Sequence, residues 1–430
     1  MRIRIRGGRL VDPVHRCDSI QDVFIAEGRI VGIGTQPDGF TAIREIDASE
    51  QVVCPGLIDL GARLREPGAE HKATIASETV AAAAGGITSL VCPPDTAPVI
   101  DETAVVELIR RRADAAGYAR VLPLGALTRG LRGEHLAEMA ALKRAGCVAV
   151  SNGAHPIVNT LVLRRSLEYA ATFGLSVFLT PADPFLTSGA CAHDGQVATR
   201  LGLSGIPIAA ETAILGRDLA LIEETGVNAH FCRLSSARAV DMVACAQEQG
   251  LKVTADVSAH HLHLTETALA GFNASAHVLP PLRSVFDRDG LRSGLERGVL
   301  CAVCSDHQPH EPDAKRAPFS DTEPGISGLD TLLALTLRLV EQKLLSLSVA
   351  IERLTSGPAR VVGLDAGHLG PGATADVCIF DPKRKWTLDP ATMTSLGHNS
   401  PFIGQEFRGR VTHTLLGGRV VYTEVSPGNR

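Results

Sequence analysis

Short apolar, β-rich segments alternate with longer helical patterns from about residue 55 to about residue 365. Such repeated strand–helix units form a parallel sheet, because two parallel strands need a long crossover connection between them. Eight such units predict an α/β fold, a (β/α)8 TIM-like barrel. The eight strand segments start near residues 56, 87, 121, 147, 175, 227, 252 and 300.

The two ends of the chain follow another pattern. Residues 1–54 and 366–430 contain strand-like segments separated by glycine turns, such as M-R-I-R-I-R-G-G-R-L-V with its period of two. Both ends are therefore predicted to fold together as a small β-sandwich domain. The predicted organisation is a barrel over 55–365, with 1–54 and 366–430 forming the β-domain.

Composition excludes several classes of protein. A chain of 430 residues with 45% hydrophobic content and a net charge of −5 is typical of a globular protein that binds neither nucleic acid nor membrane. The N-terminus lacks the apolar core of a signal peptide, and the ten cysteines form no spaced framework, so a cytoplasmic location is expected. Cys301 and Cys304 lie in an apolar strand and are predicted to pack in the core.

Several motifs lie at strand ends, where barrel enzymes carry their reactive residues. They are D-L-G-A-R-L-R-E-P-G at 59, A-A-A-A-G-G-I-T-S-L-V-C-P-P-D-T at 81, G-I-P-I-A-A-E at 205, A-H-H-L-H-L-T at 259, P-P-L-R at 280 and S-D-H-Q-P-H at 305. In this order they cover essentially the whole chain, and the chain resembles the dihydroorotases of the amidohydrolase superfamily. The resemblance implies a barrel with terminal β segments, a zinc centre and hydrolysis of a cyclic amide.

The resemblance also shows where this chain departs from the family. The family holds its metal with two histidines after strand one, a carboxylate or modified lysine after strand four, histidines after strands five and six, and an aspartate after strand eight. Only the last ligand, Asp306, is present. The other ligand positions hold Gly61, Arg63, Asn152, Thr180 and Arg233.

These replacements predict that the family's zinc is absent and that no residue acts in catalysis. A catalytic zinc needs about three protein ligands, and one aspartate does not supply them. Guanidinium groups stay protonated and place positive charge where the cation would bind. Without a metal-bound water, Asp306 is vestigial.

The substrate-binding positions are mixed. Arg65 stands where the family arginine binds the substrate carboxylate. Asp95 and Leu279 each replace a family asparagine, and Ala182 replaces an acid. Arg65 and Asp95 are therefore predicted to be remnants of a substrate site.

Structural alternatives exist for these residues. Arg65 would pair with Glu66 or another acid, and Asp306 would pair with Arg63 or Arg233 in a salt-bridged plug. A compensating metal site is disfavoured, because the resembling enzymes also carry the histidines concerned and H-H-L-H does not form one face. Those histidines are His260, His261, His263, His307 and His310.

Three functions remain. The first is a non-catalytic dihydroorotase homologue that, as the resemblance implies, assembles with the aspartate carbamoyltransferase catalytic chain, six copies of each, in de novo pyrimidine biosynthesis. The second is an active cyclic amidohydrolase with an unusual metal site. The third is a sensor in which Arg63, Arg65 and Arg233 bind an acidic metabolite.

Overall fold

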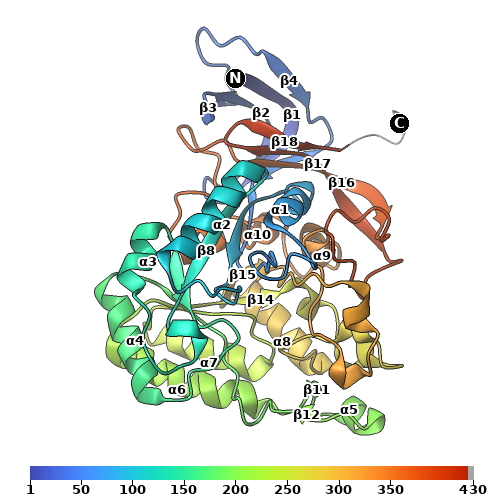
Figure 1. The fold of residues 1–430 in the computed structure, drawn as a ribbon. Helices are drawn as coiled ribbons and strands as arrows, with labels where there is room; N and C mark the ends of the chain where they lie inside the picture. The colour runs from blue at the N-terminus through green and yellow to red at the C-terminus, as the bar shows by residue number, and fades with distance from the viewer. Residues whose placement is uncertain (425–430) are drawn as a thin grey trace.

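A parallel barrel of eight strands forms the centre of the molecule in the computed structural model, which describes residues 1–424 (Figure 1). Each strand pairs in parallel with the next one around the barrel. The predicted fold class and its eight strand segments are confirmed. The strands are β6 (Leu57–Asp59), β7 (Ile87–Cys92), β8 (Arg120–Ala126), β9 (Ala149–Ser151), β10 (Val177–Leu179), β13 (Ala229–Phe231), β14 (Val253–Ser258) and β15 (Leu300–Cys304).

The barrel is nearly closed by the segments that follow its first and last strands. Ala62 and His307 form an isolated parallel bridge. The backbone N–H of Arg63 donates to the carbonyl of His307 over 2.9 Å, and His307 donates to the carbonyl of Gly61 over 3.1 Å. Residues just beyond β6 and β15 therefore lie side by side at the C-terminal ends of the strands, called here the barrel mouth.

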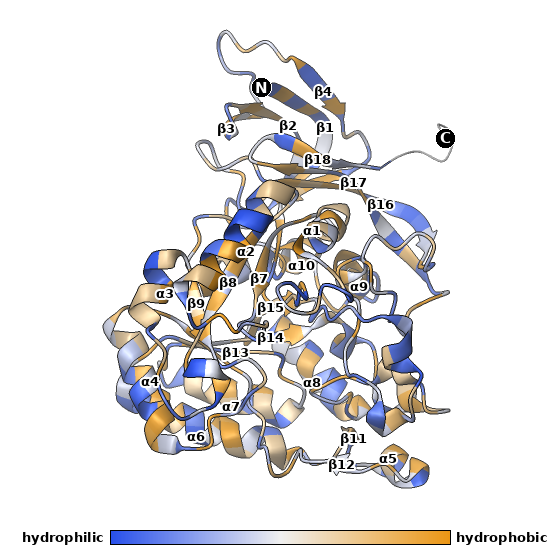
Figure 2. Cartoon of the chain, viewed as in Figure 1, coloured by the Kyte–Doolittle hydropathy of each residue, from blue (hydrophilic) through white to orange (hydrophobic). Residues whose placement is uncertain are grey.

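Helices cover the outside of the barrel. In Figure 2 the central strands are largely hydrophobic, whereas the outer helices carry hydrophilic stretches, as expected for helices packed on one face. Gly117 ends helix α2 with a left-handed φ of 69°. The helices are α1 (Ile75–Ala84), α2 (Thr103–Ala116), α3 (Met139–Ala145), α4 (Thr160–Thr172), α5 (Gln196–Leu201), α6 (Ala209–Thr225), α7 (Ala237–Glu248), α8 (Val285–Glu296), α9 (Leu332–Glu341), α10 (Leu347–Glu352) and α11 (Ser356–Val362).

Strands from both ends of the chain form a second sheet. Its order is β18-β17-β16-β5-β1-β2-β3, with β4 paired to β1, so strands from the two termini meet where β5 pairs with β16. We expected a small sandwich. In the structure, hydrogen bonds instead join these strands in one continuous sheet. They are β1 (Arg2–Asp12), β2 (Cys17–Ala26), β3 (Arg29–Ile33), β4 (Arg44–Asp47), β5 (Val52–Pro55), β16 (Val377–Thr387), β17 (Glu406–Leu416) and β18 (Arg419–Thr423).

The inside of the barrel is packed with side chains rather than open. Leu60, Val91, Leu124, Phe178 and Cys304 belong to one buried apolar cluster of this interior. Among residues 1–424, no helix combines the length and apolar character needed to cross a membrane. The short elements are the pair β11 (Ala192–His193) and β12 (Gly205–Ile206) and the 3-10 turns Arg129–Leu131, Ala259–Leu262, Glu266–Leu269, Ala274–Ala276, Pro312–Lys315 and Phe319–Asp321.

Candidate functional site: a charged plug at the barrel mouth

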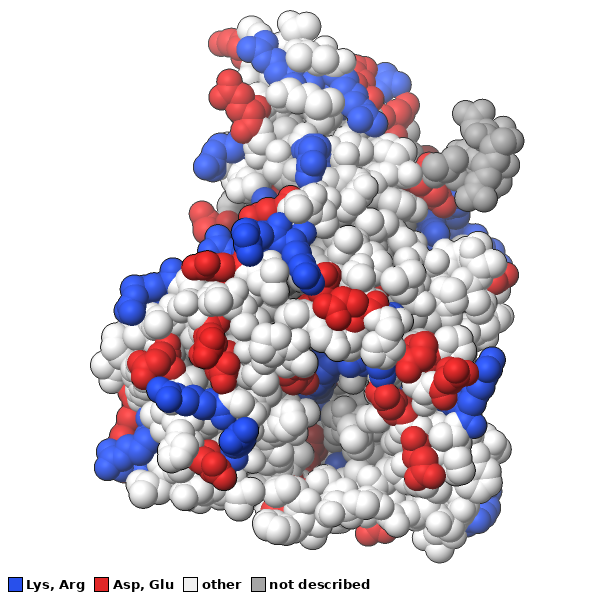
Figure 3. All heavy atoms as spheres, in the orientation of Figure 1, with Lys and Arg blue, Asp and Glu red and all other residues white. Residues whose placement is uncertain are grey.

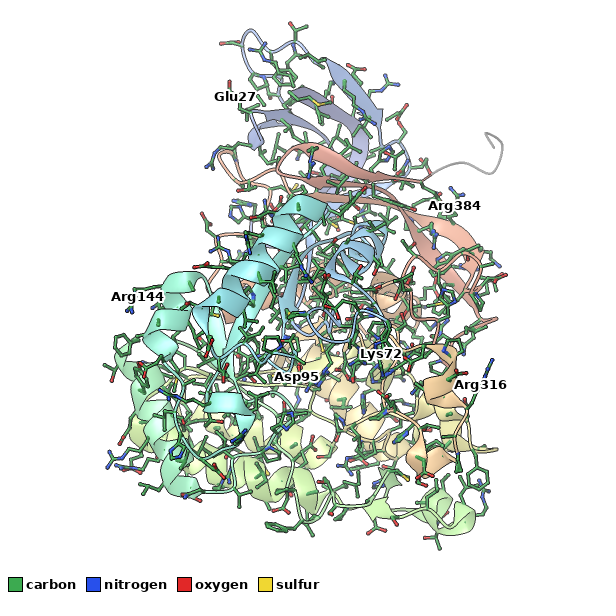
Figure 4. All side chains as sticks on the ribbon, in the orientation of Figure 1. Glu27, Lys72, Asp95, Arg144, Arg316 and Arg384 are labelled. Atoms are coloured by element: carbon green, nitrogen blue, oxygen red, sulfur yellow. The ribbon has the colours of Figure 1, made fainter. Side chains whose placement is uncertain are left out.

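Four charged residues from different strand ends meet at the barrel mouth, and we call them the plug: Arg63, Asp95, Arg233 and Asp306. Arg63 follows β6, Asp95 follows β7, Arg233 follows β13 and Asp306 follows β15. Asp95 is labelled in Figure 4, where it lies near the centre of this face. The parallel sheet brings these residues together, because all strand ends of one direction lie at the same rim.

Ion pairs connect the plug. The guanidinium of Arg63 contacts the Asp95 carboxylate, with Nη2 to Oδ2 at 2.8 Å and a hydrogen bond from Nε at 2.9 Å. Asp306 Oδ1 lies 3.7 Å from Nη1 of Arg63 and 3.4 Å from Nε of Arg233. One carboxylate therefore stands between two guanidinium groups, as in the salt-bridged plug considered above.

Burial makes these charges depend on one another. Asp306 is 1% exposed and Arg233 is 9% exposed. Burial opposes the charge of Arg233, but the neighbouring groups together, led by the Asp306 carboxylate, outweigh it, so the pKa of Arg233 is raised. Burial alone would raise the pKa of Asp95, yet the charge and hydrogen bond of Arg63, together with the charge of Arg233, outweigh it and the pKa of Asp95 is lowered. At Asp306 burial outweighs both arginines and the pKa is raised, so the plug stabilises its charges unequally.

The missing side chain at position 61 makes room for Arg233. A Cβ atom at Gly61 would lie 3.7 Å from Nη1 of Arg233, which is an ordinary van der Waals contact. A side chain longer than that of alanine would compete with the guanidinium for this space. The φ of Gly61 is not positive, so the backbone there accepts other residues. The glycine after β6 and the arginine after β13 are therefore a matched pair.

Asn152 holds the loops around β9. Its Nδ2 donates to the carbonyl of Leu131 over 3.1 Å and to the carbonyl of His155 over 2.7 Å. Its Oδ1 accepts from Thr128 Oγ1 over 2.7 Å. Three hydrogen bonds thus engage the 6%-exposed amide, and two of them need the NH₂ group that a carboxylate lacks.

The two replaced positions after β10 face the plug and a cavity. Thr180 Oγ1 accepts a hydrogen bond from Nη2 of Arg233 over 3.2 Å. Ala182 lines a cavity of about 330 Å³ beside it, and so does Leu279, which is 41% exposed. Thr180, Ala182 and Leu279 carry a hydroxyl, a methyl group and an isobutyl group, respectively.

Arg65 lies near the plug but outside its ion pairs. Its Nε donates to the carbonyl of Pro309 over 3.0 Å, and its Nη2 is 2.9 Å from Nε2 of His310. Burial and the charge of Arg63 lower the pKa of Arg65 to about 10. The suggested pairing with Glu66 is wrong, because that carboxylate instead accepts from Ile75 N over 2.6 Å and pairs with Arg112.

Individual hydrogen bonds point the histidines of the H-H-L-H segment in different directions. His260 and His261 both contact Ser258 Oγ, whereas His263 Nε2 lies 2.8 Å from the carbonyl of Leu335 in α9. Burial lowers the pKa of each of the three to about 3. They do not form one ligand set.

His307 and His310 are also committed to protein partners. His307 Nε2 is 2.8 Å from Oε2 of Glu78, and its Nδ1 accepts from Gly328 N over 3.1 Å. His310 lies between Arg65 and Lys72. Within residues 1–424, no group of three or more His, Cys, Asp or Glu side chains is placed to hold a metal ion.

The donor set at the barrel mouth does not fit the family's zinc. At the family's ligand positions it offers one carboxylate that already contacts two guanidinium groups, one amide engaged by three hydrogen bonds, and a threonine hydroxyl. Zinc in proteins takes thiolate, imidazole and carboxylate ligands. Two fixed positive charges close to that carboxylate would repel a divalent cation.

Asp256 also positions the plug, and the sequence did not predict this role. Asp256 of β14 accepts hydrogen bonds from the backbone N–H of Arg233 and faces Nε2 of His230 at 3.2 Å. Arg233 has a φ of 54°, a left-handed conformation that is uncommon outside glycine. The only signal for Asp256 was an acid inside the apolar strand K-V-T-A-D-V.

Comparison with known proteins agrees with this fold and these motifs. A family model described as dihydro-orotase-like matches residues 50–239, and one described as amidohydrolase family matches 313–422. A dihydroorotase-like protein of Pseudomonas aeruginosa is 50% identical over 422 residues, 98% of this chain and 100% of that protein. A protein named dihydroorotase from Syntrophotalea carbinolica is 44% identical over 98% of this chain and 99% of its own length.

Solved structures share the architecture. An L-hydantoinase from Arthrobacter aurescens superimposes with a TM-score of 0.88 at 22% identity, covering 99% of this chain and 97% of that one. This likeness concerns the fold, whereas the sequence identities to the two relatives extend over nearly the whole chain. The chain belongs to the dihydroorotase-like family of the amidohydrolase superfamily.

Proposed function

We propose that this protein is a catalytically inactive dihydroorotase homologue that serves as a structural subunit for the assembly of aspartate carbamoyltransferase in pyrimidine biosynthesis. Its ten cysteines are all free, which suits action in the reducing cytoplasm. The partner, and the complex of six copies of each chain, follow from the family resemblance, while the inactivity rests on the barrel mouth.

The observation that carries the proposal is the Arg233 guanidinium, which stands where the resembling enzymes have a metal-binding histidine. It fills the space beside Gly61 and contacts Asp306, the one family ligand that remains. A hydrolase of this family uses a metal to generate a nucleophile from water near neutral pH. The plug supplies cations but no base positioned to replace that metal.

Metal content and hydrolysis test the inactivity. The protein is purified without chelator from zinc-supplemented culture and analysed for metal per chain, and dihydroorotate formation and hydrolysis are assayed with added zinc. We expect substoichiometric metal and no turnover above the buffer rate. A tightly bound metal together with turnover would overturn the proposed inactivity.

Assembly is tested by co-expression with the aspartate carbamoyltransferase chain of the same organism. Size-exclusion chromatography with light scattering gives the mass of any shared peak, and each chain expressed alone serves as the control. We expect one complex and a gain of carbamoyltransferase activity over the partner alone. Separate elution of two chains with an already active partner would contradict the structural role.

The second candidate is an active cyclic amidohydrolase. It is favoured by a relative named dihydroorotase at 44% identity and by Arg65, which lies outside the plug's ion pairs. Turnover by the unmodified chain would establish it. A variant that restores the family ligands provides the positive control for the assay. It carries Gly61→His, Arg63→His, Asn152→Asp, Thr180→His and Arg233→His.

A further inference from the structure

A cavity of about 330 Å³ opens beside the plug, at the barrel mouth. Its volume lies within the range of small-molecule sites, which are mostly apolar with a few polar groups. Figure 3 shows this face hollowed, with basic side chains visible inside the hollow and mostly uncharged atoms along its lower rim. Proline rings form much of the lining: Pro156, Pro181, Pro184, Pro280, Pro281 and Pro324.

The two plug guanidinium groups that line this cavity each lie beside a carboxylate, while the buried Nε of Arg233 makes no hydrogen bond within residues 1–424. Arg63 pairs with Asp95 at 2.8 Å, and Arg233 lies 3.4 Å from Asp306. Arg65, the third arginine of the sensor hypothesis, lines a separate cavity of about 140 Å³. The arginines therefore do not converge as free cations on one anion site.

A third lining arginine, Arg283, is also balanced. Its Nε donates to Ser235 Oγ over 2.7 Å, and that hydroxyl lies 3.1 Å from Oε1 of Glu211, which lines the same cavity. Arg283 is 3% exposed, and Ser235 bridges its guanidinium to the Glu211 carboxylate. With each cation matched by an acid, a bound carboxylate would lose its hydration without gaining an unpaired positive charge.

Thr180 is a lining polar group with capacity left to donate to a ligand. Thr180 Oγ1 accepts from Arg233 over 3.2 Å, and a hydroxyl that accepts one hydrogen bond still has its own proton to donate. Thr180 lines the cavity beside Pro181 and Ala182. A ligand carbonyl placed there would accept that proton while its apolar body lay against the proline rings.

We propose that this cavity binds an uncharged, ring-sized molecule with a largely apolar body and a carbonyl group. This inference rests on the proposed function, because a working metal centre would need positions 63 and 233 that now neutralise the cavity. The preference is opposite to that of an arginine-based anion sensor.

Benzamide and benzoate provide a test, since they have the same shape and differ in charge. Binding to the purified full chain is measured by ligand-observed NMR and by the shift in melting temperature, at low and high salt. We expect benzamide to bind in the millimolar range, typical of a ligand this small, and benzoate to bind at least about tenfold more weakly. Tighter binding of benzoate, or no binding of benzamide, would overturn the proposal.

Matched variants locate the site. Ala182→Leu fills the cavity, whereas Ala391→Leu adds the same atoms to an exposed alanine outside the lining. We expect the first to abolish benzamide binding and the second to leave it unchanged, with both retaining the parent's circular dichroism and cooperative melting. Unchanged benzamide binding by folded Ala182→Leu would refute the assignment.

These measurements use the chain alone, so they are independent of assembly with the carbamoyltransferase. Failure to bind benzamide with normal assembly would reject only the ligand site. Failure to assemble with normal benzamide binding would reject only the structural role.

Discussion

Single residues at the barrel mouth are adapted to one another. Gly61 leaves the space that the Arg233 guanidinium occupies, and Asn152 donates to two backbone carbonyls. The residue at each of these positions therefore limits which side chains fit at its neighbours. Restoring single ligands should cost stability even before metal binding is considered.

Gly61→His should destabilise the fold, because its ring would extend from a Cβ only 3.7 Å from Nη1 of Arg233. We expect a loss of about 1–3 kcal/mol, the usual cost of overpacking, measured by urea unfolding. Gly61→Ala, whose methyl group makes an ordinary contact, is the control and should change stability little.

The pair is coupled only if the second replacement relieves the first. The double variant Gly61→His with Arg233→His should therefore recover about 1 kcal/mol or more relative to additivity. Additive single effects would show that position 61 does not depend on Arg233.

Asn152→Asp should destabilise the protein by about 1–3 kcal/mol, because a carboxylate would face the carbonyls of Leu131 and His155 without a proton to donate. Chemical denaturation at neutral pH measures the change. Asn159→Asp is the matched control, since Asn159 is an exposed helix cap that accepts from Leu161 N and Val162 N and aspartate caps equally well. Equal stability of the two variants would be evidence against the hydrogen-bond role of Asn152.

At the scale of elements, the plug connects the ends of four strands. Arg63 and Asp306 join the first and last strands of the barrel, while Asp95 and Arg233 add β7 and β13. A metal ion bound by ligands from several strands would connect them in a similar way. The ion pairs connect these strand ends in addition to the backbone hydrogen bonds between the segments after β6 and β15.

Asp306→Asn should cost about 3–5 kcal/mol, because it leaves the buried Arg233 guanidinium without its carboxylate. Denaturant unfolding measures the loss, and amide exchange should rise in the segments after β6 and β15. Asp313→Asn removes the exposed pair with Arg316, whose side chains are 83% and 75% exposed, and should have little effect. Similar small effects from both variants would show that the plug does not stabilise the barrel.

At the scale of the whole molecule, buried neutral histidines make stability depend on pH. His260, His261 and His263 have ordinary pKa values of 6.5, and burial lowers the folded-state pKa of each to about 3. Below pH 6.5 the unfolded chain binds protons that the folded chain does not. The stabilisation is complete above pH 6.5 and declines as pH falls toward 3.

The free energy of unfolding should therefore fall between pH 6.5 and about 5, before most carboxylates titrate, by up to about 1.4 kcal/mol per pH unit for each histidine. Urea unfolding across this range measures the slope. His263→Gln should reduce this slope by the share of one histidine, whereas His135→Gln, at an exposed position, should leave the slope unchanged. A flat profile in the parent protein would contradict the buried neutral state.

The sequence by itself determined the barrel and the identity of its mouth residues. Strand–helix alternation is a local pattern, because each βα unit carries its own apolar period and turns, and all eight strand segments agree with the structure. The motif positions also follow from the chain, since residues after parallel strands must lie at one rim. The loss of metal-ligand residue types was readable from the resemblance to the dihydroorotases.

Only the tertiary structure decided how those residues interact. Which carboxylate neutralises Arg63, how Gly61 accommodates Arg233, and that Arg65 contacts His310 instead of Glu66 depend on side chains far apart in sequence. The same is true of the cavity's charge balance, in which Ser235 bridges Arg283 and Glu211. Local sequence patterns encode the period and the turn, whereas charge pairing depends on distances that exist only after the strands have closed into a barrel.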